Sequence, residues 1–197
     1  MNVRLMLERE RNWTVLFIGG ASGIGKSSIA YELARYYHTN VMEVDDIYQA
    51  VKAMTTKEDL PAIHYFSTGI NWMDINVSGN VKWLIDVSRE LIPGLQSIVE
   101  NHIESDVPVI IEGDFIDPEF TLFNKNPKVK SLFLSEPDRN QIIKNYLVRE
   151  GGEPQHYRAD ISVEYGHWLE TRCKHLGIQV IDSRPWNTAI ERMIECL

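Results

Sequence analysis

The sequence has 197 residues, of which 44% are hydrophobic and 24% charged, and this balance is that of an ordinary globular protein. The length suits a single domain, and we expect residues 1–197 to form one domain with its own core. The formal net charge of −8 argues against a general nucleic-acid binder, because such a protein needs a basic face.

The sequence also gives no sign of a membrane or a disulfide-rich protein. It contains no stretch of the roughly 20 apolar residues that cross a bilayer, and residues 1–13 lack the apolar core of a secretory signal. Cys173 and Cys196 are too far apart to suggest a zinc site or a redox pair. We therefore expect reduced thiols, a cytoplasmic location and no membrane partner.

Apolar segments alternate with segments of helical spacing along the chain. The predicted strands are residues 13–18, 40–46, 107–115, 128–135 and 177–183. The predicted helices are residues 26–38, 46–54, 78–104 (interrupted at Pro93 and Gly94), 137–149, 161–176 and 188–196. This order predicts an α/β fold, a three-layer sandwich with a five-stranded parallel sheet between helices. Ligands of such sheets bind beyond the carboxyl ends of the strands.

Residues 20–27 match the phosphate-loop pattern G-x-x-x-x-G-K-[ST] between a predicted strand and a predicted helix. Glycine lets the backbone N–H groups curl around phosphate oxygens, and the helix N-terminus adds unpaired donors. We expect Lys26 to reach the β- and γ-phosphates, Ser27 to bind Mg²⁺ and Ser28 to bond the α-phosphate. The alternative is a glycine-rich turn with a surface lysine. The loop residues assigned to the nucleotide are Gly20, Ala21, Ser22, Gly23, Ile24 and Gly25.

Acidic residues end two of the predicted strands. Glu112 follows an apolar run and is expected to hold Mg²⁺ through water, and Asp114 is a second candidate for that task or for the acceptor. Asp45 is expected to accept a proton from an attacking hydroxyl, while one of Asp45 and Asp46 would serve only as a helix cap. Which of Asp45, Asp46 and Asp114 acts as the base stays open.

Arginines flank a polar segment that has hinge-like glycines. We expect a mobile helical lid at about 149–160, with Arg149 and Arg158 stabilising the moving phosphoryl charge and Arg139 contacting the nucleotide. A solvated loop is the alternative. Near the end of the chain, Arg184 and Trp186 are candidates for stacking on a purine ring, unless the tryptophan only covers the core.

With these features in order, the sequence resembles the nucleoside-monophosphate-kinase-like branch of P-loop proteins. The segments GGASGIGKSSIA, VDDIYQAV, VIIEGDFIDPEF and DSRPWNTAIERM are similar to 2-phosphoglycerate kinase and related small-molecule kinases. The resemblance implies a mobile lid and ATP with Mg²⁺ as the phosphoryl donor. It matches Lys26 and Ser27 to the phosphate and magnesium residues, Asp45 to the acid that faces the acceptor, and Glu112 to the glutamate of the family's "EG" strand end.

Two positions depart from the family pattern. Tyr48 stands where an arginine often follows the acid, and Phe115 stands where a histidine is expected after "EG". Both fall where the acceptor should bind. Phosphoglycerate is therefore not carried over as the substrate.

The predicted function is an ATP-dependent kinase that phosphorylates a hydroxyl of a small molecule. Segment 57–77 should border the acceptor pocket through His64, Tyr65, Trp72 and Asp74, or else lie in the core. No basic cluster lies there, which favours a neutral or weakly charged acceptor such as a nucleoside, a sugar or an antibiotic-like alcohol. The alternatives are a nucleotide-dependent switch with a protein partner and a kinase of nucleotide sugars. The choice of ATP over GTP and the oligomeric state, monomer or homodimer, stay open.

Overall fold

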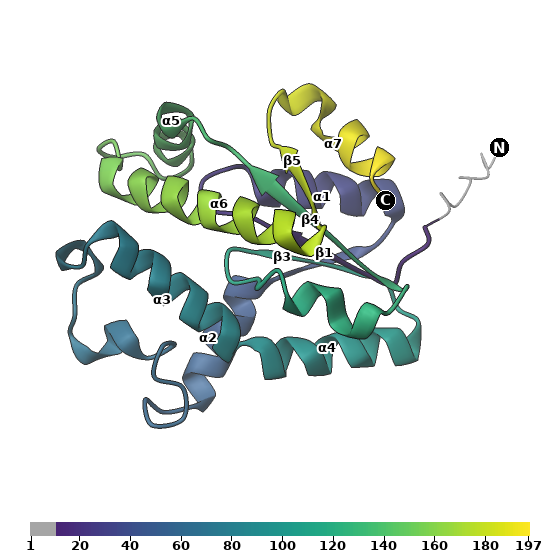
Figure 1. Ribbon diagram of the computed structural model, residues 1–197, viewed down its shortest axis with the longest axis horizontal. Coiled ribbons are helices and arrows are strands. Elements are labelled where there is room, and N and C mark those ends of the chain that lie inside the picture. The colour runs from purple at the N-terminus through teal and green to yellow at the C-terminus, as the bar shows by residue number, and fades with distance from the viewer. Residues whose placement is uncertain (1–10) are drawn as a thin grey trace, which may run out of the picture.

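The computed structural model describes residues 11–197, so the expectation for residues 1–13 lies mostly outside the described part (Figure 1). The strands are β1 (Val15–Gly19), β2 (Asn40–Glu43), β3 (Val109–Gly113), β4 (Val129–Ser135) and β5 (Gln179–Asp182). The α-helices are α1 (Lys26–Tyr37), α2 (Val44–Met54), α3 (Val77–Glu90), α4 (Ile92–Ser105), α5 (Arg139–Glu150), α6 (His156–Leu176) and α7 (Trp186–Glu195). Short 3-10 helices are η1 (Tyr65–Thr68), η2 (Trp72–Asp74) and η3 (Phe120–Lys125).

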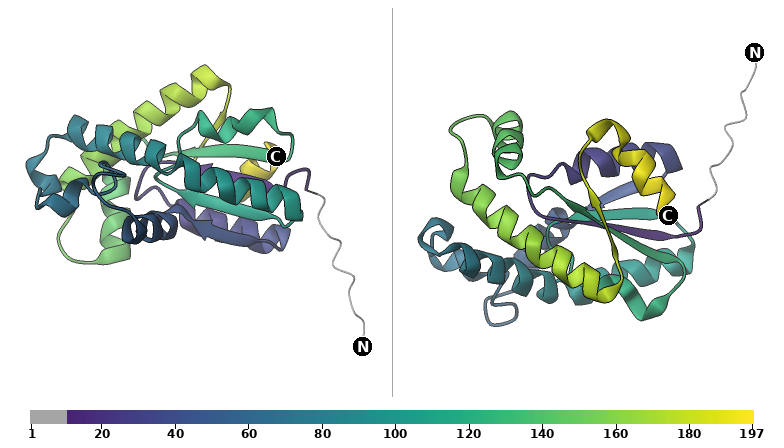
Figure 2. Two further views of the ribbon diagram at one scale, coloured as in Figure 1. Left: turned by 90° about the horizontal axis from the view of Figure 1, so that it is seen from below. Right: turned by 45° about the horizontal axis from the view of Figure 1, so that its top comes forward.

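The five strands form one parallel sheet in the order β2-β3-β1-β4-β5. Every residue of β1 and β3 is buried, as expected for continuous apolar strands that are covered on both faces. Helices α1 and α7 pack together on one face, and α6 and α4 lie on the other (Figures 1 and 2). The predicted α/β fold with a five-stranded parallel sheet is confirmed.

The sheet register brings the candidate residues to one edge. Ile18 pairs with Glu112 and Gly19 pairs with Gly113, so β1 and β3 end at the same level. The phosphate loop follows β1 directly, and the acidic residues of segment 112–114 end β3. The carboxyl edge of the sheet therefore holds both groups.

The junction between the second strand and the following helix differs from the prediction. The second strand ends at Glu43 rather than at the aspartates, and α2 begins at Val44 with Asp45 and Asp46 in its first turn. Neither aspartate is the N-cap, which is Glu43. Carboxylates in the first turn of a helix are favoured by its macrodipole, so the acids fit the helix as well as the strand end. The long helical stretch is divided into two helices, as predicted, but the break falls at Leu91, between α3 and α4, and Pro93 lies in the first turn of α4.

The segment predicted as a helical lid, about residues 149–160, contains the end of one helix and the start of the next. Helix α5 extends to Glu150, and α6 begins at His156 instead of residue 161, which leaves residues 151–155 between them. The early turn of α6 is stabilised by packing, because Ala159 is fully buried and the Tyr157 ring stacks on Trp72. Sequence polarity gave no sign of these contacts, which explains the displaced boundary.

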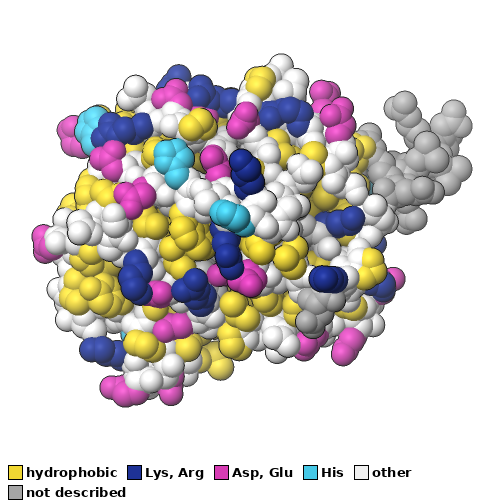
Figure 3. All heavy atoms as spheres, in the orientation of Figure 1, with side chains coloured by type: hydrophobic (Ala, Val, Ile, Leu, Met, Phe, Trp, Pro, Cys, Tyr) yellow, Lys and Arg dark blue, Asp and Glu magenta, His cyan; other side chains and the backbone are white. Residues whose placement is uncertain are grey.

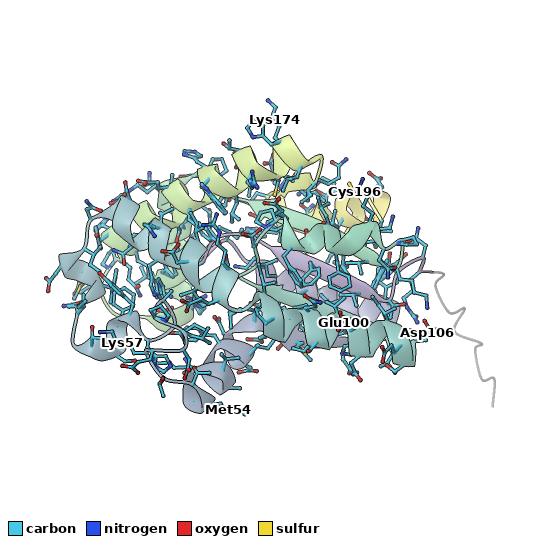
Figure 4. All side chains as sticks on the ribbon, turned by 60° about the horizontal axis from the view of Figure 1, so that its bottom comes forward. Met54, Lys57, Glu100, Asp106, Lys174 and Cys196 are labelled. Carbon is cyan, nitrogen blue, oxygen red and sulfur yellow. The ribbon has the colours of Figure 1, made fainter. Side chains whose placement is uncertain are left out.

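The structure describes the surface and both cysteines in residues 11–197. Acidic and basic side chains are intermixed on the face drawn in Figure 3. None of the helices in residues 11–197 has the length and apolar character needed to cross a membrane. Cys173 and Cys196 are free thiols, and burial raises the pKa of Cys173 to about 12. Figure 4 shows Cys196 far from Met54, which lies at the end of α2 and is 86% exposed.

Candidate functional site

Three glycines shape the loop between β1 and α1. Gly20, Gly23 and Gly25 have φ values of 146°, 77° and 91°, a region that L side chains rarely adopt. A Cβ at Gly20 would lie 2.7 Å from the Leu134 carbonyl oxygen, and a Cβ at Gly25 would lie 2.6 Å from the Trp186 ring. The loop is therefore a tight backbone turn that opens helix α1, which is the form a phosphate cradle requires.

Replacing Gly20 by alanine is expected to lower the free energy of unfolding by about 1–3 kcal/mol, because both the φ value and the carbonyl contact oppose a side chain. Gly166→Ala is the matched control: it lies inside α6 with open space around its Cβ position. That control should gain up to about 1 kcal/mol from helix propensity. Urea unfolding of both variants measures the difference, and equal stabilities would contradict this account of the loop.

Lys26 is buried at the start of α1, with only 6% of its surface exposed. Its ammonium donates to the Ala21 carbonyl oxygen at 2.8 Å and to Oδ1 of Asp114 at 2.5 Å. Burial alone would lower the pKa of Lys26, but the carboxylates of Asp114 and Glu112 outweigh burial and hold the pKa above its ordinary value. The loop thus contains a permanent cation beside two acids.

Glu112 lies at the end of β3, is 3% exposed and hydrogen bonds with the Ser27 side chain. Burial raises its pKa, while Lys26 and the Ser27 hydroxyl act in the opposite direction. Among the described residues, no three His, Cys, Asp or Glu side chains form a metal cluster. Mg²⁺ is usually held by one or two protein oxygens together with phosphate and water, so the Ser27–Glu112 pair fits this ion.

Asp45 reaches the same place from the first turn of α2. Its side chain is exposed into a cavity that is also lined by Lys26, Glu112 and Asp114. The surrounding cavity walls raise the pKa of Asp45, and the nearby Asp114 carboxylate raises it further. Asp46 does not line this cavity.

The cavity has a volume of about 1020 Å³. It extends from the phosphate loop to helix α3 and is bounded by the end of β3 and by helices α5 and α6. Small-molecule sites commonly measure roughly 300–1,000 Å³. This cavity is therefore at the upper end of that range, and it connects the phosphate loop with Asp45.

Arg149 and Arg158 both line the cavity, at the end of α5 and the start of α6. Their guanidinium groups lie 5.3 Å and 4.3 Å from the centre of the Tyr146 ring. Glu150 binds both arginines, at 2.5 Å to Arg149 and 3.0 Å to Arg158. A hydrogen bond from Gln155 and these two arginines lower the pKa of Glu150 to about 2.

Known proteins are similar in sequence to this chain over most of its length. No family model matches the sequence. The chain is 25% identical over 191 residues to the 2-phosphoglycerate kinase of Pyrococcus horikoshii, covering 92% of this chain and 63% of that protein. It is 30% identical over 199 residues to the 2-phosphoglycerate kinase of Methanothermobacter thermautotrophicus, covering 93% and 65%. The chain thus spans just under two thirds of the length of these curated relatives.

Solved structures resemble the fold. A gluconokinase from Sinorhizobium meliloti superposes with a TM-score of 0.53 at 18% identity, covering 93% of this chain and 90% of that one. A shikimate kinase from Bacteroides thetaiotaomicron gives a TM-score of 0.51 at 15% identity, covering 93% and 97%. The chain has the fold of the P-loop kinases. The predicted resemblance to this group is confirmed.

Two arginines assigned to the nucleotide lie outside the cavity of this P-loop kinase fold. Arg139 bonds to Asp160 at 2.5 Å and so joins α5 to α6. Arg184 forms an ion pair with the buried Glu136 and lies 3.3 Å from Asp138. Neither residue lines the cavity, whereas Trp186 does.

Several residues that support the P-loop were not singled out from the sequence. The Tyr146 ring covers Gly23, and its hydroxyl is 2.9 Å from the Ser162 hydroxyl. Asn145 donates to the Gly23 carbonyl at 2.7 Å, and Tyr165 donates to the Asp114 carbonyl at 2.8 Å. Tyr146 lies three residues before Arg149 on α5, and residues at this spacing share one face of a helix. This spacing was the feature of the sequence that could have identified Tyr146.

Aromatic side chains form the cavity wall opposite the P-loop. We use the name aromatic wall for Phe66, Trp72, Trp83 and Phe115, all of which line the cavity. Of the four residues expected here in segment 57–77, only Trp72 lines the cavity; His64 instead lies 3.1 Å from the Thr55 hydroxyl. The two departures from the family pattern meet, because Tyr48 stacks on Phe115 with ring centres 5.2 Å apart.

Proposed function

We propose that this chain is an ATP-dependent kinase that transfers the γ-phosphoryl group to a hydroxyl of a small molecule. The observation that carries the proposal is the single cavity shared by the phosphate-loop lysine, Lys26, and the exposed carboxylate of Asp45. The likeness to proteins named 2-phosphoglycerate kinase supports it. A nucleotide switch would not need a second carboxylate-lined compartment beside its phosphate loop.

The chain's own residues would hold the donor as follows. The loop amides and Lys26 would bind the β- and γ-phosphates, and Lys26 would exchange its bond to Asp114 for a phosphate oxygen. Ser27 and Glu112 would hold Mg²⁺, which when bound neutralises charge on the β- and γ-phosphates. Trp186, which lies against Gly25, would border the nucleotide.

The transfer step would use Asp45 as the base. Its carboxylate would accept the hydroxyl proton while the acceptor oxygen bonds to the γ-phosphorus. The bond from that phosphorus to the β–γ bridging oxygen breaks, and ADP leaves with the bonding electrons. A raised pKa brings Asp45 closer to a working pH near neutrality, which suits a general base.

Arg149 and Arg158 would act from a lid at about residues 149–160. In this structure Glu150 holds both guanidinium groups beside Tyr146. Gly151 and Gly152 have φ values of 68° and 75°, and nothing lies within 4 Å of either Cβ position, so this turn can change conformation without steric conflict. Closure would move the arginines from Glu150 onto the charge that spreads over the transferring group.

Arg158→Ala is expected to lower kcat by on the order of 100-fold, because a cation on the developing charge is lost. Arg139→Ala is the matched control, since that arginine pairs with Asp160 outside the cavity. Steady-state kinetics on both variants, with melting temperatures, separates the two roles. An equal loss of kcat in the control would show that Arg158 acts through the packing of α5 on α6.

The proposed function is tested by acceptor-stimulated release of ADP. The protein is incubated with ATP, Mg²⁺ and a panel of metabolites and antibiotics, and ³¹P NMR follows the product. The expected result is faster ADP release with at least one acceptor, together with a new phosphomonoester signal. A regulatory protein would give a different result. It would hydrolyse ATP slowly, no acceptor would accelerate the hydrolysis, and it would bind a protein partner with an affinity that changes with ATP.

A further inference from the structure

The cavity has two ends of different charge. Its cations are Lys26 of the P-loop, Lys144 and Arg149 of α5, and Arg158 near the start of α6. The described residues that line it from α2, η1, η2, α3 and the end of β3 include no lysine, arginine or histidine. The cations among these lining residues thus come from the P-loop, α5 and α6, and not from the elements α2, η1, η2 and α3.

The polar side chains that α2 and α3 present to the cavity accept hydrogen bonds. Asp45 offers a carboxylate. The Asn80 amide nitrogen donates to the carbonyl oxygens of Trp72 at 2.9 Å and Ile75 at 3.1 Å, which fixes the orientation of the amide. None of the residues that the structure describes donates a hydrogen bond to Asn80 Oδ1. A ligand here would therefore have to supply donors, such as hydroxyl or amine groups.

The aromatic wall gives this end a fixed apolar surface. The Trp83 ring lies 4.7 Å from Phe66 and 5.6 Å from Phe115, and its indole nitrogen donates to the Ala62 carbonyl at 2.9 Å. Phe115 is held from behind by Tyr48, whose hydroxyl donates to the Ile63 carbonyl at 3.1 Å. Flat rings anchored in this way can pack against the carbon face of a sugar or a base.

A carboxylate or phosphate on the acceptor would meet these rings and the Asp45 carboxylate. Lys26 would already bind the donor phosphates, and the described lining residues of α2, η1, η2 and α3 supply no cation. Burying an unpaired charge is costly, and like charges raise the cost further. We infer that the acceptor is a hydroxylated ring compound with no anionic group, and that the aromatic wall selects it. This inference rests on the proposed kinase function. It excludes 2-phosphoglycerate, which carries two anionic groups, as the acceptor of this chain.

The test compares matched ligand pairs on protein saturated with the ATP analogue AMP-PNP and Mg²⁺. Sugars, nucleosides and aminocyclitols are each paired with a carboxylated or phosphorylated counterpart, for example uridine with uridine 5′-monophosphate. Ligand-observed NMR gives the affinities. The expected result is at least about tenfold tighter binding of the members that lack an anion. Equal or tighter binding of the anionic members, or no binding of either kind at millimolar concentration, would overturn the inference.

Two wall variants sharpen the test. Phe66→Leu should weaken binding of the uncharged ligand, while Tyr65→Leu, a neighbour in η1 outside the cavity lining, should not. Phe115→His adds a polar, ionisable ring and should shift the preference toward anionic ligands. Unchanged discrimination in both wall variants would contradict the role of the wall. Failure of the kinase proposal would give a different result. AMP-PNP and the acceptor would both bind, but no phosphoryl group would be transferred from ATP.

Discussion

Replacing Lys26 by alanine is expected to lower turnover by on the order of 1,000-fold, because the only buried cation among the described cavity-lining residues is lost. Arg149 and Arg158 do not take its place, because they lie at the end of α5 and the start of α6, whereas Lys26 is buried within the phosphate loop. The fold should survive: Asp114 is 20% exposed toward the cavity and can be hydrated once its partner is gone. Turnover is measured by ADP release, and the fold by circular dichroism and melting temperature.

Lys144→Ala is the matched control for this variant. Lys144 lines the same cavity from α5 but is exposed. Its loss should change turnover only a few-fold, as expected for a solvent-screened charge. Lys26→Met, which fills the same space without a charge, should be as inactive as the alanine variant. Near-normal turnover in either Lys26 variant would refute the assigned role.

Asp45→Asn is expected to lower kcat by roughly 100- to 10,000-fold, the usual range for loss of a general base, while ATP affinity stays close to that of the unmodified protein. The amide keeps the size of the side chain but cannot take the proton. The pH profile gives a second measure. The pKa of Asp45 is raised above its ordinary value of 3.8, so its carboxylate becomes protonated and the rate falls at a higher pH than for an ordinary aspartate.

The Asp45→Asn variant should lack this acid limb of the profile. Asp46→Asn is the control, because Asp46 lies in the same turn of α2 but does not line the cavity. It should keep both the rate and the profile. Comparable losses of kcat and ATP affinity in Asp45→Asn would instead assign Asp45 to binding or structure.

Local patterns were sufficient to predict most of the fold and the centre of the site. The strands are continuous apolar runs. Residues 20–27 form one contiguous motif, and its interpretation depends only on the strand before it and the helix after it. Glu112 was found because a parallel strand ends there, and strand ends meet at one edge. Each of these signals lies within a few residues of sequence.

The other features depend on contacts between distant segments. Arg139 was assigned to the nucleotide because it is a cation near the lid, and Arg184 because it lies beside Trp186 after the last strand. Their carboxylate partners, Asp160 and Glu136, lie 21 and 48 residues away along the chain. The cover that Tyr146 forms over Gly23 likewise joins α5 to the P-loop. Side chains that pair across such separations produce no periodic pattern in a single sequence. This pairing nevertheless determines which charged side chains line the cavity.

Isothermal titration calorimetry with ATP at millimolar Mg²⁺ tests the central claim most directly, because it asks whether the turn after β1 binds a triphosphate. We expect saturable binding of ATP at one site per chain, with affinity lost in Lys26→Ala and retained in Lys144→Ala. Absence of binding for every purine triphosphate, or equal affinity in the Lys26→Ala variant, would contradict it.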